Sequence, residues 1–247
     1  MASHDALTVM TFNLGAGLAD PARLVGVLRR SGADVVGLQE LAPEQAAAID
    51  EGLAAEFPYR LLRPLGIPGK GLLSRFPLRD AELLDLFPGR PDARATVGAP
   101  GGPVTVVVAH PPPPRIGRRW RENATAAEQL ARVVEAATAG GPAVVLADVN
   151  RVAWQGAYRR IAAAGLVDAF GVAGRGRGAT APTRLVAGGV SRAALPPLLR
   201  IDYVWHTAHF RAEAAWIGED AGSDHLPVLA RLVREGEVGT SPSSWVG

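Results

Sequence analysis

The sequence AVVLADVN at positions 143–150 is an apolar run that ends in two polar residues. Its first five residues have the composition of a buried strand, and Gly140-Gly141 precede them as a turn signal. Asp148 and Asn150 are two positions apart, so their side chains point to the same side of an extended backbone. An apolar strand does not need these groups in order to fold, and they are therefore candidates for a functional site.

A polar residue stands at or near the end of an apolar run at five further places. These are Asn13 after 9–12, Glu40 after 35–38, His110 after 106–109, Asp202 within 201–204, and Asp224-His225 before 227–232. Unpaired carboxylates are costly to bury. Several of them at strand ends therefore indicate one shared site, built around a cation that prefers oxygen ligands.

Short apolar runs alternate along the chain with Ala/Leu/Arg-rich stretches and Gly/Pro-rich turns, which is typical of an α/β fold. We expect strands at 7–12, 35–38, 71–74, 104–109, 143–147, 201–205, 210–217 and 227–232. We expect helices from the cap signal Asp20-Pro21 to Gly32, at 122–137 and at 154–164. Segment 171–192 has no period and is expected to be a long surface loop. No internal linker is evident, so residues 1–234 should form a single domain, followed by a C-terminal tail at 235–247.

The composition excludes several classes of protein. With 247 residues, of which 48% are hydrophobic and 20% charged, the chain has ample material for a globular core. The absence of cysteine excludes thiolate zinc sites and a cysteine nucleophile, so any metal must bind oxygen or imidazole ligands. The formal net charge of +2 is too small to indicate a nucleic-acid binder by bulk charge. Of the 26 basic residues, only Lys70 is a lysine.

The sequence as given shows no targeting segment. The first residues lack a basic segment followed by an apolar run, and no uninterrupted apolar stretch of about 20 residues occurs. We therefore expect a cytoplasmic protein that is not inserted in a membrane, and leave secretion of a processed form open. No protein partner is indicated, and a monomer is expected.

A basic stretch follows the His110 run. It contains Arg115, Arg118, Arg119 and Arg121, together with an aromatic residue at position 120. A cationic loop that bears an aromatic side chain can follow a phosphate backbone and stack on a base, which makes these arginines candidate substrate-binding residues. Alternatively, they only solvate the start of the helix expected at 122–137.

The chain resembles the endonuclease/exonuclease/phosphatase superfamily, in particular its DNase I-like and sphingomyelinase-like branches. It does so in six motifs that occur in the family's order: Thr11-Phe12-Asn13, Gln39-Glu40, His110, Asp148-Val149-Asn150, Ile201-Asp202-Tyr203 and Ser223-Asp224-His225. The resemblance implies a four-layer α/β sandwich, in which two packed mixed β-sheets are flanked by helices. It also implies attack of water on a phosphoester with Mg²⁺ as cofactor, or Mn²⁺ as a substitute.

The resemblance also implies a role for each site residue. Asn13 and Glu40 would hold the metal, joined by Asp224, because a hard cation prefers carboxylate and amide oxygens. Asp202 would fix the tautomer of His225, and either His225 or Asp148 would take the proton from the attacking water. Asn150 would position the phosphate or the nucleophile. His110 would either bind a non-bridging oxygen or protonate the leaving group.

The chain departs from the family pattern in one respect that concerns the site. The acidic partner of the first catalytic histidine in DNase I-like enzymes has no clear counterpart around 69–75. We expect a nucleic-acid phosphodiesterase of the endonuclease type acting on DNA or RNA. The alternatives are a phospholipid or sphingolipid phosphodiesterase and a phosphomonoesterase on a small molecule. A non-catalytic scaffold is disfavoured because the chemical positions are filled.

Overall fold

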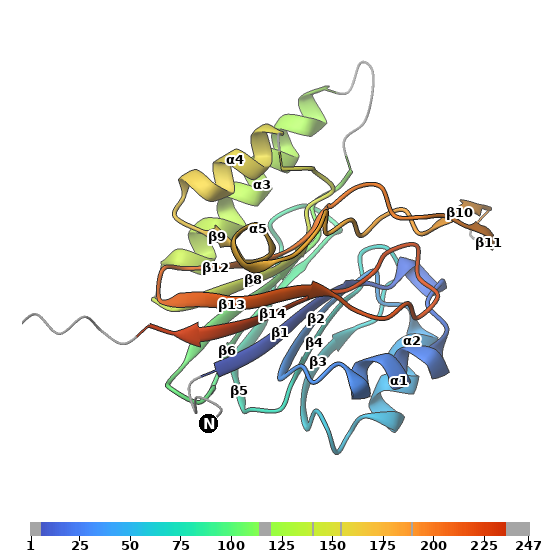
Figure 1. The fold of residues 1–247 in the computed structure, drawn as a ribbon, viewed down its shortest axis with the longest axis horizontal. Coiled ribbons are helices and arrows are strands. Elements are labelled where there is room, and N and C mark those ends of the chain that lie inside the picture. The colour runs from blue at the N-terminus through green and yellow to red at the C-terminus, as the bar shows by residue number, and fades with distance from the viewer. Residues whose placement is uncertain (1–5, 114–119, 140, 154, 189, 236–247) are drawn as a thin grey trace, which may run out of the picture.

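The computed structural model describes residues 6–113, 120–139, 141–153, 155–188 and 190–235 (Figure 1). One six-stranded sheet contains β1 (Ala6–Asn13), β2 (Val35–Gln39), β3 (Tyr59–Arg63), β4 (Lys70–Ser74), β13 (Phe210–Ile217) and β14 (Val228–Arg234). The other contains β5 (Leu78–Leu84), β6 (Asp92–Val97), β7 (Val104–Ala109), β8 (Ala143–Asp148), β9 (Val167–Asp168) and β12 (Asp202–His206). Their strand orders are β13-β14-β1-β2-β4-β3 and β5-β6-β7-β8-β12-β9.

Both sheets are mixed. The pairs β1–β2 and β7–β8 are parallel, and the other neighbouring strands are antiparallel. The carboxyl ends of a parallel pair lie at the same edge of a sheet, so each sheet presents two such ends side by side. The polar residues that follow these four strands are therefore brought to one end of the molecule.

The two sheets pack face to face through a core of branched side chains. Val9 of β1 and Val35 of β2 share one buried cluster with Val106 of β7 and Leu146 of β8. At Gly37 the sheets approach closely, since a Cβ atom built there would lie 2.8 Å from the Cβ atom of Leu146. Any side chain at position 37 would push the sheets apart.

Helices cover the outer faces of both sheets (Figure 1). They are α1 (Pro21–Arg30), α2 (Pro43–Gly52), α3 (Trp120–Thr138) and α4 (Gly156–Ala163). The short α5 (Ala169–Ala173) instead contributes Ala169 and Phe170 to the buried cluster between the sheets, and a 3-10 turn η1 (Gly15–Gly17) follows β1. On the first sheet, Phe12 is buried with Leu24 of α1 and Ile49 of α2. On the second, Val145 is buried with Val133 of α3. The four-layer α/β sandwich expected from the sequence is confirmed. No helix in the described ranges is long and apolar enough to cross a membrane.

The sequence prediction located eight strands to within two residues, namely β1, β2, β4, β7, β8, β12, β13 and β14, and was wrong about segment 171–192. Instead of a continuous loop, the segment contains β10 (Arg184–Ala187) and the first part of β11 (Val190–Ala194). The two strands form an antiparallel hairpin that projects from the sandwich (Figure 1). Strands β3, β5, β6 and β9 were also missed.

Candidate active site

The site lies at the end of the sandwich where β1, β2, β7 and β8 finish, and it joins the two sheets. The Nδ2 atom of Asn13, on β1, donates a hydrogen bond of 2.8 Å to Oδ2 of Asp148, on β8. Both side chains are buried. The Oδ1 atom of Asn13 accepts from the backbone N–H of Gly15, which fixes the orientation of the amide. This hydrogen bond thus fixes the relative positions of two polar side chains that are 135 residues apart in the sequence.

A histidine–carboxylate pair lies beside this bond. Asp202 is directly opposite Asp148 in the antiparallel β8–β12 register and is completely buried. Its Oδ2 atom lies 2.9 Å from Nδ1 of His225, and Nε2 of His225 lies 3.9 Å from Oδ2 of Asp148. Because Asp202 occupies Nδ1, the Nε2 side of the ring is directed to Asp148.

The backbone around His225 is also tied to the first sheet. The hydroxyl of Ser223 donates to the backbone oxygen of Asn13 at 2.7 Å and accepts from the backbone N–H of His225 at 3.1 Å. His225 is therefore held in two ways: Asp202 of β12 contacts its ring, and Ser223 links its backbone to β1.

Charge–charge interactions in this buried cluster shift the pKa values of two groups. Burial, followed by the charge of Asp202, raises the pKa of Asp148 to about 7. Burial alone would lower the pKa of His225, but the carboxylates of Asp202 and Asp148 outweigh it and raise this pKa to about 10. The two groups therefore titrate as an interacting pair.

His110 follows β7 and faces two carboxylates. Its Nε2 atom lies 3.6 Å from Oε1 of Glu40 and 3.6 Å from Oδ2 of Asp148. The ring is buried, and burial together with the charge of Lys70 lowers the pKa of His110 well below its usual range. The Nδ1 atom has no hydrogen-bond partner among the described residues.

Two site residues adopt backbone conformations that are uncommon outside glycine. Glu40 has φ of +53° and Asn150 has φ of +52°. The backbone N–H of Asn150 donates to Oδ1 of Asp148 at 2.8 Å, and its side-chain amide donates to the backbone oxygen of Pro111 at 3.0 Å. Asn150 thus links the ends of β7 and β8, and strained residues of this kind cluster at functional sites.

Glu40, Asp224 and Asn13 form an oxygen-rich corner. Burial, followed by the charge of Asp224, raises the pKa of Glu40, and a hydrogen bond from Asn13 opposes this shift. A Cβ atom on Gly15 would lie 2.7 Å from Oδ1 of Asp224, so only glycine lets the chain after β1 approach this carboxylate. Within the described part of the chain, no lysine or arginine pairs with either acid. Two facing carboxylates without a cationic side chain suit a hard divalent cation.

A second group of side chains could also hold a metal. The ligand atoms of Asp148, Asp202 and His225 all lie within 4.8 Å of one another. In this group, Oδ2 of Asp202 and Nδ1 of His225 already form a hydrogen bond with each other.

Several residues near the site were missed by the sequence analysis. Asp92, at the start of β6, accepts from the backbone N–H of His110 at 3.0 Å and from Nε2 of Gln129 at 3.1 Å. Burial raises the pKa of Asp92 to about 6. Lys70, at the start of β4, is buried beside this network. Its being the only lysine was a signal, whereas Asp92 gave none because β6 was not predicted.

The described residues do not include every candidate. Arg115, Arg118 and Arg119 lie outside the described residues, and of Arg121 only its place on α3 is described.

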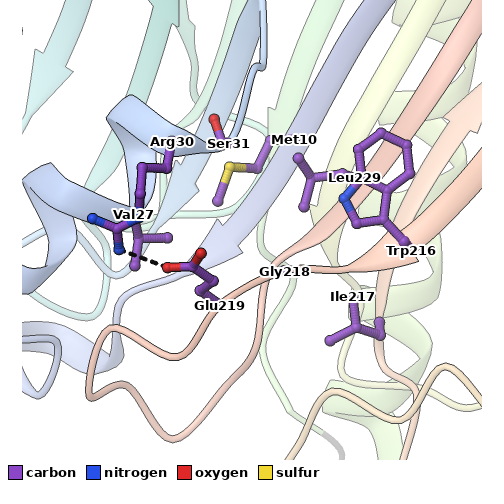
Figure 2. Close-up of a pocket in the computed structure, with 9 residues that line it drawn as sticks. All are labelled: Met10, Val27, Arg30, Ser31, Trp216, Ile217, Gly218, Glu219 and Leu229. Carbon is purple, nitrogen blue, oxygen red and sulfur yellow. Dashed lines mark hydrogen bonds and ion pairs between the residues drawn. The ribbon is translucent and has the colours of Figure 1, made fainter.

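The 300 Å³ cavity in Figure 2 lies away from these residues, between α1 and the end of β13. Met10 and Leu229 line it, and Arg30 pairs with Glu219 at its rim at 2.6 Å. It contains none of the strand-end groups described above, so it offers no comparable chemistry.

The chain belongs to the Endonuclease/Exonuclease/phosphatase family, whose model matches residues 10–225. Members of this family are generally phosphoester hydrolases and typically use divalent metals. A comparison with functionally curated proteins finds no match to this sequence.

Solved structures share the fold over nearly the whole chain. An endonuclease/exonuclease/phosphatase from Beutenbergia cavernae is 25% identical, with a TM-score of 0.72 over 94% of this chain and 72% of that one. A Bacteroides vulgatus protein of the same description is 21% identical, with a TM-score of 0.71 over 93% and 99%. TDP2 from D. rerio, solved with a single-strand DNA product, is 16% identical, with a TM-score of 0.70 over 92% and 98%.

Proposed function

We propose that this protein is a divalent-metal-dependent phosphodiesterase that cleaves nucleic acid by attack of an activated water. The observation that carries the proposal is the buried Asp202–His225 pair, whose free Nε2 atom faces Asp148. Because its raised pKa keeps His225 protonated at neutral pH, Nε2 of His225 can donate a hydrogen bond to a water that also contacts Oδ2 of Asp148. The carboxylate of Asp148 can then accept the proton of this water. Asp202 supports the step by fixing which ring nitrogen faces the water.

Glu40, Asp224 and Asn13 are the residues that would hold Mg²⁺, or Mn²⁺ in its place. When bound, the cation supplies positive charge to a phosphate oxygen. Asn13 also donates to Asp148, so the same amide couples the metal corner to the group that faces the water. Asn150 holds Asp148 from the other side through its backbone N–H.

Two observations support nucleic acid as the substrate. The basic stretch at 115–121 follows the strand that carries His110, and its arginines and Trp120 suit a phosphate backbone with exposed bases. TDP2, which shares this fold, has been solved with a single-strand DNA product.

A plasmid-nicking assay tests the proposal. The protein is incubated with supercoiled plasmid in Mg²⁺, Mn²⁺ or EDTA, beside the His225→Ala variant. His209→Ala is the matched control, because His209 is exposed and lies at the opposite end of β12 from Asp202. We expect metal-dependent nicking by the wild type and by His209→Ala, and none by His225→Ala. Equal nicking by all three would reject the assigned site.

A phospholipid phosphoester is the second candidate, because apolar side chains surround the site. We define the apolar rim as six exposed residues: Leu65, Ile67, Leu185, Leu195, Leu198 and Leu199. They lie on two segments, one before Lys70 and one formed by the β10–β11 hairpin and its continuation. Both segments adjoin the metal corner, since Gly69 accepts a backbone hydrogen bond from Leu41 and Thr183 donates one to Asp224. Exposed apolar groups gathered around a site favour contact with lipid.

The two substrates are distinguished with vesicles. Mg²⁺-dependent hydrolysis is measured on phosphatidylcholine–sphingomyelin vesicles and on plasmid, with the double variant Leu198→Gln/Leu199→Gln. Val172→Gln is the control, because Val172 is 65% exposed but lies on α5, outside the rim. Vesicle hydrolysis that falls only in the double variant would favour the lipid, and plasmid cleavage without vesicle hydrolysis would exclude it.

A further inference from the structure

Lys70 is buried to an extent that is unusual for lysine. It is 1% exposed and begins β4, between β2 and β3 in the first sheet. The register places it opposite Gln39, the residue before Glu40. Lysine is almost never fully buried without a charged partner, because desolvating an ammonium group is costly. The position of Lys70 therefore needs an explanation.

The described residues provide little compensation for this ammonium group. Its one hydrogen bond goes to the backbone oxygen of Pro68, at 3.2 Å. No carboxylate in the described part of the chain forms an ion pair with it, and both oxygens of Asp92 are committed to His110 and Gln129. Since an ammonium has three donors, two remain without a described acceptor.

The surroundings of Lys70 are those of the candidate active site. The charges that act on it include those of Asp92, Glu40 and Asp148. Its own charge acts on His110, together with that of Arg90, whose Nη1 atom is buried without a partner among the described residues. His110 and Asp148 are 2% and 1% exposed, so Lys70 lies at the same depth as the residues assigned to the chemistry.

We propose that the ammonium group of Lys70 binds a non-bridging oxygen of the substrate phosphate, and that Lys70 is a further catalytic residue of this enzyme. Lys70 and Arg90 are basic groups whose charges act on His110, next to the carboxylates of Glu40 and Asp148. A phosphate held between a metal on one side and Lys70 on the other would satisfy the free donors. Preorganised donors in a buried site stabilise the charge that develops on the phosphate. This inference rests on the proposed phosphoesterase function.

The alternative is that Lys70 only holds the preceding loop through Pro68. Three variants separate the two roles. Lys70→Met removes the charge at similar length, Lys70→Gln keeps a donor for Pro68 without the charge, and Lys70→Arg keeps the charge. Arg63→Met is the matched control, because Arg63 is the exposed neighbour of Lys70 on β3.

The measurements are kcat/KM with Mg²⁺ and the affinity for inorganic phosphate by titration calorimetry. We expect Lys70→Met and Lys70→Gln to lose about 10²-fold to 10³-fold in kcat/KM. Phosphate affinity should fall by at least about tenfold in both, Tm should not fall, and Lys70→Arg should recover part of both losses. Unchanged phosphate affinity in folded Lys70→Gln would overturn the inference, as would equal losses in Arg63→Met. If the wild type hydrolyses no phosphoester but binds phosphate through Lys70, the proposed function is wrong and the phosphate site at Lys70 is supported.

Discussion

Replacement of Asp148 by asparagine should stabilise the protein at pH 8 while abolishing most of its activity. Burial, together with the charge of Asp202, raises the pKa of Asp148 to about 7. In the unfolded chain this carboxyl has an ordinary pKa of about 3.9. The folded state therefore binds the proton more tightly, so stability falls as the pH rises from about 4 to about 7 and stays reduced above that. Asparagine cannot ionise and escapes this loss.

The size of the effect follows from the two pKa values. Ionisation of Asp148 destabilises the folded wild type by about 4 kcal/mol at pH 8, but by only about 1–2 kcal/mol at pH 5. The new amide also opposes the Nδ2 donor of Asn13, at a cost of about 1–3 kcal/mol that does not depend on pH. His225, with its pKa raised to about 10, stays protonated in the folded protein at both pH values. The stability of the variant relative to wild type should therefore improve by about 2–3 kcal/mol between pH 5 and pH 8.

Urea unfolding followed by circular dichroism measures this difference. Both proteins are unfolded at pH 5 and pH 8 in EDTA, because a bound cation would stabilise the folded state and change the titration. Asp85→Asn is the control, since Asp85 is exposed. A stability difference that is the same at both pH values would refute the argument that Asp148 is a destabilising buried carboxylate.

Three further substitutions test other parts of the molecule. Glu40→Gln should raise the Mg²⁺ concentration needed for half-maximal activity by about tenfold or more, because it removes one of two carboxylates from the metal corner; an unchanged Mg²⁺ titration would count against that corner. Gly37→Ala should lower the free energy of unfolding by about 1–3 kcal/mol, because the added Cβ would clash with Leu146. Thermal unfolding measures this loss, and an unchanged Tm would show that the two sheets tolerate the methyl group. Neutralising the arginines of 115–121 should raise KM for DNA far more than KM for a small chromogenic phosphodiester, and equal effects would return this stretch to a structural role.

The central strands could be predicted from the sequence because burial on both faces leaves a continuous apolar run. Every residue of β2 and of β8 is buried, and both strands were expected within one residue of their observed ends. Strand β5 is the opposite case. It is an edge strand whose middle residues are exposed, so it lacks an apolar period. Strand β10 was missed because its side chains alternate only between half-buried and exposed positions and none is buried.

Site residues could be predicted where a polar residue interrupts an apolar run. They could not be predicted where a residue reaches the site only through the packing of the folded chain. Asn13 and Asp148 stand out in the sequence, and they meet across the two sheets. Lys70 and Asp92 carry no such local mark. Their importance comes from burial beside His110, which depends on how β4 and β6 lie under the site and cannot be read from neighbouring residues.

The pairing of β1 with β14 has a consequence for the order in which activity can arise during synthesis. Because β14 lies between β1 and β13, the first sheet lacks an interior strand until residues 228–234 have joined it. His225 stands just before that strand, and its backbone is fixed to β1 through Ser223. A chain interrupted before β14 would leave β1 as an open edge and His225 unanchored. The proposed site should therefore be completed only once the last strand is in place.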